Sequence, residues 1–236
     1  MGVSNIRVLV TDVDGTLTFE DLRVCLEAVS VLRLLEGRGV RVILASGNAI
    51  IILMALARYF GLSGGVVGEN GGVVYVRGDL KVLGRADYAL KAKEIIMRKF
   101  GSFLIESRQN RFRFVDFAFK VRRDAPISRG RLLSMCRMAV KDLPVEVTDS
   151  GVAFHVHERG ICKSRGVEIL LDYWGVDWSE VLAVGDGLTD IDLLEKAEVG
   201  VALAHAPEEV KAVATYVTSR RYAFGFLEAV KRFFNL

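Results

Sequence analysis

The chain has 236 residues, of which 51% are hydrophobic and 26% are charged, so it can bury a large core and does not have the composition of a disordered protein. Its 32 basic and 29 acidic residues leave a formal charge of only +3, which does not indicate a nucleic-acid binder. No apolar segment approaches the roughly 20 residues needed to cross a bilayer, and no signal peptide is recognisable, so we expect a soluble, cytoplasmic protein with no membrane partner. The cysteines are widely spaced, which favours buried thiols over disulfides or a zinc site: Cys25, Cys136 and Cys162.

The first part of the chain alternates between strand-like and helix-like segments. Residues 6–10, which are apolar apart from Arg7, are typical of a central strand of a parallel sheet. A helical pattern over residues 22–35 follows and ends near Gly37. This alternation predicts a parallel sheet with covering helices. Further elements are expected at residues 40–45 (strand), 49–60 (helix, closed by Gly61), 65–68 and 73–76 (strands).

The pattern changes near residue 85, where hairpin turns indicate a separate module. The elements expected there are helices at 86–100 and 128–141, a strand at 112–121 and two short strands within 145–156. The first pattern then resumes, with helices at 163–174, 191–196 and 222–234 and strands at 180–185, 199–203 and 216–218. The predicted fold is therefore α/β: a doubly wound, Rossmann-like parallel sheet core formed by residues 1–84 and 159–236, with an inserted α+β domain at residues 85–158.

Two carboxylates directly follow the first strand. Asp12 and Asp14 are separated by one residue and precede Gly15. In open α/β sheets ligands bind beyond the carboxyl ends of the strands, and positions i and i+2 of an extended chain point to the same side. Two converging anions repel each other, so this arrangement needs a cation or a shared proton. The alternative is an ordinary turn, in which one aspartate caps and the other is solvated.

Two further polar sites lie at the ends of core elements. Ser46 and Gly47 follow the second strand, where a hydroxyl group and N–H groups at a helix start can bind phosphate; a simple helix cap is the alternative. Lys163 begins a helix, where its charge opposes the helix dipole. It therefore suits a site that gathers anions, although a solvated surface lysine remains the alternative.

A second pair of carboxylates, Asp186 and Asp190, follows the strand at residues 180–185. Together with Asp12 and Asp14, four acids are expected at the same edge of the sheet. Four carboxylates need a positive partner, and hard oxygen ligands with open water positions suit Mg²⁺. The sequence therefore predicts a magnesium site.

The segments DVDGT at residues 12–16 and GDGLTD at residues 185–190, with Ser46 and Lys163 between them, resemble the four motifs of the haloacid dehalogenase superfamily. The module between the second and third motifs is similar to the C2-type cap of the Cof-like branch. Chain length and cap most resemble the archaeal phosphoglycolate phosphatases. One position departs from the pattern: Thr189 stands where the family commonly has Asn, which changes the surroundings of the metal.

The resemblance implies a Mg²⁺-dependent phosphomonoester hydrolase that works through an aspartyl-phosphate. The expected substrate is 2-phosphoglycolate or a similar small phosphorylated metabolite. Asp12 would be the nucleophile, and Asp14 would donate and accept the proton. The remaining implied roles are phosphate binding by Ser46, Gly47 and Lys163, and metal binding by Asp12, Asp14, Asp186 and Asp190. The cap would close over the site and contact the leaving group.

The residues of the cap that contact the leaving group are not defined by a motif. Two pairs alternate along expected strands and could face the cleft, with a solvated sheet face as the alternative: Arg111 with Arg113, and His155 with His157. Four aromatic residues are expected in the core of the cap: Phe112, Phe114, Phe117 and Phe119. His205 is expected to belong to loop structure.

Other classes of protein share parts of this pattern. A receiver-type signalling domain also carries a phosphoaccepting Asp, but it needs neither a cap nor a second Asp two residues later. A nucleotide-binding Rossmann protein would have a GxGxxG turn after its first strand, where this chain has DVDGT. Within the superfamily, a sugar-phosphate phosphatase or a phosphomutase is the alternative. Monomer and homodimer are both compatible with the sequence.

Overall fold

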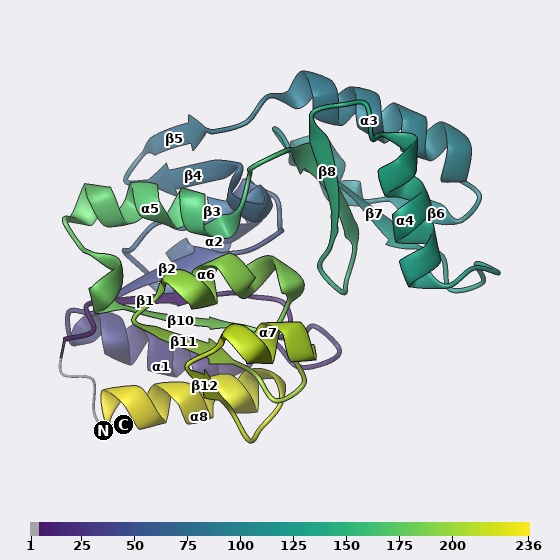
Figure 1. The fold of residues 1–236 in the computed structure, drawn as a ribbon. Helices are drawn as coiled ribbons and strands as arrows, with labels where there is room; N and C mark the ends of the chain where they lie inside the picture. The colour runs from purple at the N-terminus through teal and green to yellow at the C-terminus, as the bar shows by residue number, and fades with distance from the viewer. Residues whose placement is uncertain (1–4) are drawn as a thin grey trace.

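The large sheet is the centre of the fold. A computed structural model describes residues 5–236 (Figure 1). The strands of the large sheet are β1 Val8–Thr11, β2 Arg41–Ala45, β3 Val66–Gly68, β4 Val73–Val76, β5 Asp79–Val82, β10 Val181–Gly185, β11 Val199–Ala202 and β12 Tyr216–Val217. They form an eight-stranded sheet in the order β12-β11-β10-β1-β2-β3-β4-β5. The strands from β12 to β3 are parallel, whereas β4 and β5 add to one edge as antiparallel strands.

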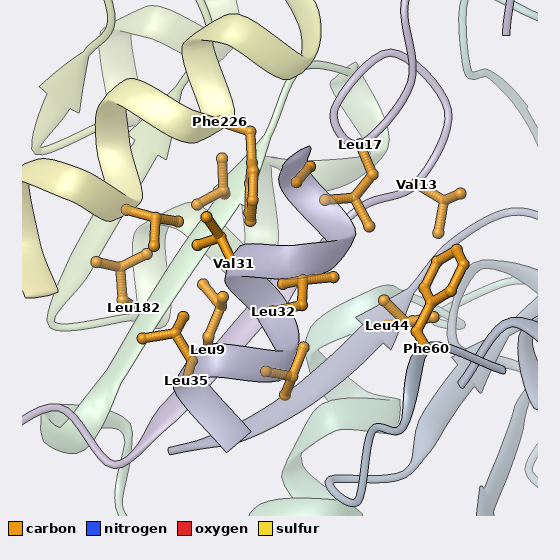
Figure 2. Packing of buried hydrophobic residues seen from close by; sticks show 14 of the residues in the cluster. Leu9, Val13, Leu17, Val31, Leu32, Leu35, Leu44, Phe60, Leu182 and Phe226 are labelled. Atoms are coloured by element: carbon orange, nitrogen blue, oxygen red, sulfur yellow. The ribbon is translucent and has the colours of Figure 1, made fainter. Parts of the chain in front are cut away.

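Helices cover both faces of this sheet. One face packs against α1 Leu26–Gly37, α2 Ile50–Phe60 and α8 Tyr222–Phe234, and the other against α5 Lys163–Trp174, α6 Ile191–Lys196 and α7 Glu208–Val213. Strand β1 is buried on both sides: Leu9 joins the cluster under α1, whereas Val8 and Val10 join the cluster under α5. Figure 2 shows the first of these clusters, with Leu32 and Phe226 packed over the sheet. Burial on both faces explains why the central strands are continuous apolar runs.

A second sheet lies between β5 and α5 in the chain. Its elements are α3 Ala86–Phe100, β6 Leu104–Glu106, β7 Phe117–Val121, α4 Arg129–Ala139, β8 Val145–Asp149 and β9 Phe154–Glu158, and its strands are antiparallel in the order β6-β7-β9-β8. We call residues 86–158 the insert. Phe119 and Phe154 face α3 and α4 and form the core of the insert. Ala118 and His155, which pair across β7 and β9, point the other way, toward the edge of the large sheet.

The part of the chain that the structure describes also contains four short 3₁₀ helices. They are η1 Glu69–Gly71, η2 Arg108–Phe112, η3 Trp178–Glu180 and η4 Leu188–Asp190. None of the helices within residues 5–236 has the length and apolar character that a membrane span requires. Of the three cysteines, Cys25 and Cys136 are buried, as expected, whereas Cys162 is only half-buried.

The α/β fold class is confirmed, and so are the helices expected at 86–100, 163–174, 191–196 and 222–234. The helix expected at 22–35 begins only at Leu26, because Leu22 has a φ of 64° and Thr18 bridges to Val24 in antiparallel fashion. Strands β5 and β6 and helix α7 were not predicted.

The strand expected at 112–121 is wrong in its first half. Only β7 is extended, because residues 108–112 form η2 and the next residues form a loop. Phe117 and Phe119 are buried in the core of the insert, as expected, but Phe112 and Phe114 are 59% and 43% exposed. The alternating aromatic residues begin before the backbone enters the sheet at Phe117, so the alternation alone does not locate the start of β7.

Candidate active site

Three strand ends bring polar side chains to one place. Asp12 follows β1, Ser46 follows β2 and Asp186 follows β10. These strands are neighbours and parallel, and Thr11 at the end of β1 pairs with Leu44 on one side and Val184 on the other. The side chains that follow the strands therefore meet at the carboxyl edge of the sheet, where α/β folds bind their ligands.

Lys163 is the positive group at this edge. Its Nζ donates to Asp12 Oδ1 at 2.9 Å and to Asp190 Oδ1 at 2.6 Å, and the residue is only 2% exposed. The solvated lysine considered from the sequence is therefore wrong. Burial alone would lower the pKa of Lys163, but the carboxylates of Asp12 and Asp190 raise it, so the side chain stays charged.

The start of α5 holds Lys163 in place through close backbone packing. Gly71 of η1 has a φ of 102°, and a Cβ there would overlap the carbonyl group of Cys162. The N–H of Ser164 in the first turn of α5 donates to Asp192 at the start of α6. This carboxylate supplies the cap that the residue before α5 does not provide. Helix start and lysine are therefore fixed from two sides.

Asp186 and Asp190 have different surroundings. Asp190 is buried, and its Oδ2 accepts from the backbone N–H groups of Asp186 at 3.1 Å and Gly187 at 2.9 Å, so it shapes the loop after β10. Asp186 lines the pocket and accepts from the Thr16 hydroxyl at 2.6 Å. Asp190 therefore contacts Lys163 from outside the pocket, whereas Asp186 lines the pocket.

His205 also contacts Asp186, which the sequence did not predict. Its Nε2 lies 3.2 Å from Asp186 Oδ2, and its Nδ1 accepts from the backbone N–H of Tyr222. Because Nδ1 is an acceptor, the proton of the neutral ring is on Nε2 and is donated to Asp186. His205 does lie in a loop, as expected, but this loop supports the acidic site. The sequence signal that could have indicated this role is the position of His205 just after β11, a strand of the same sheet.

The acidic cluster fits a divalent cation. Asp12, Asp186 and Asp190 each offer a carboxylate oxygen, and these oxygens all lie within 4.8 Å of one another. Burial raises the pKa of Asp12 and Asp190, against the effect of Lys163. One lysine does not offset this many carboxylates, whereas a bound cation would keep them ionised. Hard oxygen donors of this kind suit a metal such as Mg²⁺.

Asp14 is held from the side of β2. Asn48 donates through Nδ2 to Asp14 Oδ2 at 2.7 Å and to Ser46 Oγ at 3.2 Å. Asp14 is half-buried and Ser46 is buried. The site residues predicted after β2 were Ser46 and Gly47, and Asn48 was not among them. Asn48 lies in the same turn after this strand, so the same argument applies to it.

A pocket of about 170 Å³ opens over these groups. Six of the seven site residues expected from the sequence line it: Asp12, Asp14, Ser46, Gly47, Lys163 and Asp186. Asp190 does not line it, in keeping with its place behind Lys163. Thr189 lines the pocket beside the loop after β10. The influence of Thr189 on a bound metal stays a prediction.

The insert forms the opposite wall of the pocket. Gln109, Arg113, Lys120 and His155 reach it from η2, the following loop, β7 and β9. Arg113 donates to the carbonyl of Gly47 at 2.7 Å and to Asp116 at 3.1 Å. The insert and the large sheet therefore touch directly at the loop that carries Ser46.

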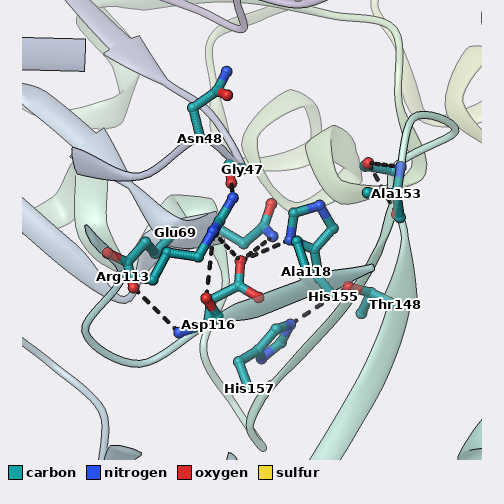
Figure 3. Close-up of polar contacts among 12 residues, drawn as sticks. Gly47, Asn48, Glu69, Arg113, Asp116, Ala118, Thr148, Ala153, His155 and His157 are labelled. Atoms are coloured by element: carbon teal, nitrogen blue, oxygen red, sulfur yellow. Dashed lines mark hydrogen bonds and ion pairs between the residues drawn. The ribbon is translucent and has the colours of Figure 1, made fainter. Parts of the chain in front are cut away.

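A buried carboxylate organises this wall. Figure 3 shows Asp116 between Arg113 and His155, whose Nδ1 lies 2.8 Å from Asp116 Oδ2. Asn70 of η1 donates to the same oxygen at 2.9 Å. Burial by itself would raise the pKa of Asp116, but His155 and Arg113 lower it to about 2. The wall is thus an internally neutralised ionic cluster.

The two members of each alternating pair, Arg111 with Arg113 and His155 with His157, do not lie in the same surroundings. One member of each pair faces the cleft, namely Arg113 and His155. Arg111 is exposed and lies outside this pocket, and His157 is buried beside Thr148. The solvated sheet face is therefore wrong for three of the four residues, because the loop before β7 breaks the alternation and His155 on β9 packs against Gly47.

Glu69 fixes the loop between η2 and β7. It follows β3, is fully buried and accepts the backbone N–H groups of Phe114, Val115 and Asp116. Burial raises its pKa, against the backbone N–H groups of Val115 and Asp116, which lower it. We call these contacts the Glu69 clasp. No local pattern in the sequence indicated them, because the partners are 45 to 47 residues apart.

Comparison with known proteins identifies the family. Residues 9–103 and 133–230 match the model of the haloacid dehalogenase-like hydrolases. The chain belongs to this family. It is 37% identical over 227 residues to a phosphoglycolate phosphatase of Methanothermobacter thermautotrophicus, which covers 96% of this chain and 98% of that protein. It is 33% identical over 233 residues to a phosphoglycolate phosphatase of Methanospirillum hungatei, with 97% of both chains covered.

Solved structures of other proteins share the fold of this chain. A crystal structure of a Thermoplasma acidophilum protein superposes with a TM-score of 0.85 at 25% identity, covering 98% of this chain and 100% of that one. A sugar phosphatase of haloacid dehalogenase subclass IIB superposes with a TM-score of 0.79 at 21% identity, covering 98% and 100% of the two chains. The resemblance inferred from the motifs is confirmed.

Proposed function

We propose that this haloacid dehalogenase-like hydrolase is a Mg²⁺-dependent phosphatase that hydrolyses 2-phosphoglycolate to glycolate and phosphate, or acts on a similar small phosphorylated metabolite. The observation that carries the proposal is Asp12 at the floor of a small pocket, paired with Lys163 and flanked by further carboxylates. The names of the relatives at 33% and 37% identity support the substrate.

In the first step, an Asp12 carboxylate oxygen attacks phosphorus and the bond from phosphorus to the alcohol oxygen breaks. Asp14 gives its proton to that departing oxygen, which leaves as the neutral alcohol. Lys163 and Ser46 line the same pocket and bind the phosphoryl oxygens, where negative charge must be balanced. The phosphoryl group is then an ester of Asp12.

In the second step, water attacks phosphorus and gives its proton to Asp14, and the bond from phosphorus to Asp12 breaks. Phosphate leaves, and both aspartates return to their starting states. Mg²⁺, held by Asp12, Asp186, the backbone carbonyl of Asp14 and Asp190, would supply positive charge beside the phosphoryl group. Asp190 would contribute mainly by fixing Lys163 and the loop after β10, because its oxygens already accept N–H groups.

We propose that residues 1–84 and 159–236 form the catalytic core and residues 85–158 a cap that selects the leaving group. The pocket of about 170 Å³ suits a small substrate better than a bulky one. Arg113 is committed to Asp116 and Gly47, whereas Lys120 is exposed and lines the pocket. Lys120 is therefore suited to pair with a carboxylate such as that of glycolate.

A panel of phosphate esters tests the proposal. Release of free phosphate from phosphoglycolate, glycerol phosphate and hexose phosphates is measured with Mg²⁺ and with a chelator. We expect Mg²⁺-dependent release, fastest from phosphoglycolate, and a loss of at least about 10³-fold for Asp12→Asn. The exposed acid Asp79, changed to Asn, is the matched control. Wild-type turnover by Asp12→Asn would disprove the mechanism, and a preference for hexose phosphates would disprove the substrate.

A further inference from the structure

A chain of hydrogen bonds runs from the insert to Asp14. Gln109 of η2 donates through Nε2 to Asn48 Oδ1 at 2.8 Å, and Asn48 donates through Nδ2 to Asp14 Oδ2 at 2.7 Å. Gln109 Oε1 accepts the backbone N–H of Ala49 at 2.9 Å. Only two side chains thus separate the insert's backbone from the carboxylate of Asp14.

The donors and acceptors in this chain fix one another. The N–H of Ala49 can only donate, so Gln109 must present its oxygen there and its NH₂ group to Asn48. Asn48 must then present its oxygen to Gln109 and its NH₂ group to Asp14 and Ser46. Arg113 Nη2, at 3.3 Å from Gln109 Oε1, reinforces the same orientation. Without Gln109, the Asn48 amide loses the partner that fixes its NH₂ group toward Asp14.

Asp14 makes this orientation important for the reaction. In the proposed function, its proton goes to the departing oxygen, so the position of the Asp14 carboxyl determines how well the alcohol leaves. Gln109 lies in η2 and belongs to the insert, not to the large sheet. The position of Asp14 is therefore linked to contact between the insert and the large sheet.

We propose that Gln109 is a positioning residue that orients Asp14 for proton transfer through Asn48, and does so only while the insert is docked on the large sheet. The proposal rests on the proposed function, because it gives a task to the acid of that mechanism. It implies that the proton donor is aligned when the pocket is closed.

The leaving group provides the test. In kcat/KM, which covers the steps up to departure of the alcohol, an alkyl phosphate needs a proton on its leaving oxygen, whereas p-nitrophenyl phosphate leaves readily without one. For Gln109→Ala we expect a loss of roughly 10-fold to 100-fold with phosphoglycolate, or with the best alkyl ester of the panel, and of less than about 3-fold with p-nitrophenyl phosphate. Gln109→Met, which keeps the side-chain length, should behave the same way and serves if Gln109→Ala does not fold.

Two neighbours in η2 are the controls. Asn110 bonds only within the insert, to Glu106 and Ala118, and Arg108 is exposed. Asn110→Ala and Arg108→Ala should lack the selective loss. In addition, Asn48→Ala combined with Gln109→Ala should be no worse than Asn48→Ala alone, because both changes break the same chain.

The outcomes separate the inference from the proposed function. Equal losses of Gln109→Ala on both esters, no loss on either, or a selective loss in Asn110→Ala would overturn the inference and leave the phosphatase intact. A wild-type protein that hydrolyses none of the esters would overturn the proposed function, and with it the inference. A loss confined to the alkyl ester, with additivity absent in the double variant, supports the inference.

Discussion

The two walls of the pocket handle charge in opposite ways. On the wall formed by the large sheet, four carboxylates gather at one edge, and Lys163 pairs with two of them, Asp12 and Asp190. On the wall formed by the insert, Asp116 is matched by Arg113 and His155 and accepts from Asn70 as well. The first wall needs a cation from outside, whereas the charge of Asp116 in the second is already balanced by Arg113.

This difference separates two tasks. A surplus of buried negative charge is costly unless a cation or substrate relieves it, so it marks the place where chemistry is expected. A neutralised buried cluster holds a surface in one shape and gains nothing from a ligand. Four predictions test this contrast, beginning with the largest expected effect.

Replacing Lys163 should reveal the surplus of buried negative charge as a loss of stability. Lys163→Met leaves Asp12 and Asp190 buried without their partner, so we expect a loss of about 3–5 kcal/mol in the free energy of unfolding, measured by urea titration in a chelator. Added Mg²⁺ should recover part of this loss by binding the folded state. A Lys163→Met protein as stable as wild type in the chelator would contradict the charge surplus.

Shifting the start of α5 should affect the same wall through its backbone. Gly71→Ala places a Cβ against the carbonyl of Cys162, and we expect a loss on the order of 2–3 kcal/mol together with lower phosphatase activity. Gly78→Ala is the matched control, because Gly78 has a φ of 100° but open space around it. Its cost should be limited to the backbone strain of about 1 kcal/mol. Similar costs for both variants would rule out the packing argument.

Acid should weaken the insert's wall. Because the pKa of Asp116 is lowered to about 2 in the folded protein, its carboxylate stabilises the fold at pH values above the ordinary aspartate range. This contribution, roughly 2 kcal/mol, should disappear as the pH falls from about 4 to about 2. Chemical unfolding across this range should show the stability of wild type and Asp116→Asn converging as the pH falls. A constant difference between them would contradict the lowered pKa.

The smallest effect concerns the leaving group. Lys120→Ala removes an exposed cation from the pocket, so we expect KM for phosphoglycolate to rise by about 10-fold, equivalent to about 1.4 kcal/mol, with little change in kcat. Methyl phosphate, which lacks the carboxylate, is the control substrate and should show little change in KM. An equal rise for both esters would mean that Lys120 attracts the phosphate instead.

The same contrast explains which residues the sequence could predict. Asp12, Ser46, Lys163 and Asp186 lie at the ends of regular elements, and hydrophobic periodicity locates those ends from local sequence alone. Parallel pairing then places them side by side without further information. The fold class could therefore be predicted, and six of the seven site residues expected from the sequence do line the pocket.

The insert's wall depends on partners that are far apart in the chain. Gln109 meets Asn48 across 61 residues, and His155 meets Asp116 across 39. His205 reaches Asp186 only because β11 lies next to β10. Such contacts follow from the docking of two units, and no spacing rule within a segment encodes them. The break of the strand before Phe117 was missed for the same reason, since Glu69 imposes it from outside.

The Glu69 clasp also limits how the pocket can open. The insert has two covalent connections to the large sheet, and the clasp joins the two units as well, beside the contacts of Arg113 and Gln109, because Glu69 follows β3 and its partners precede β7. If the insert moved away from Glu69 as a rigid body, the hydrogen bonds from the N–H groups of Phe114, Val115 and Asp116 would all break together. We therefore expect the gap between the insert and the large sheet to open most at the points farthest from the clasp. Substrate and product would pass there.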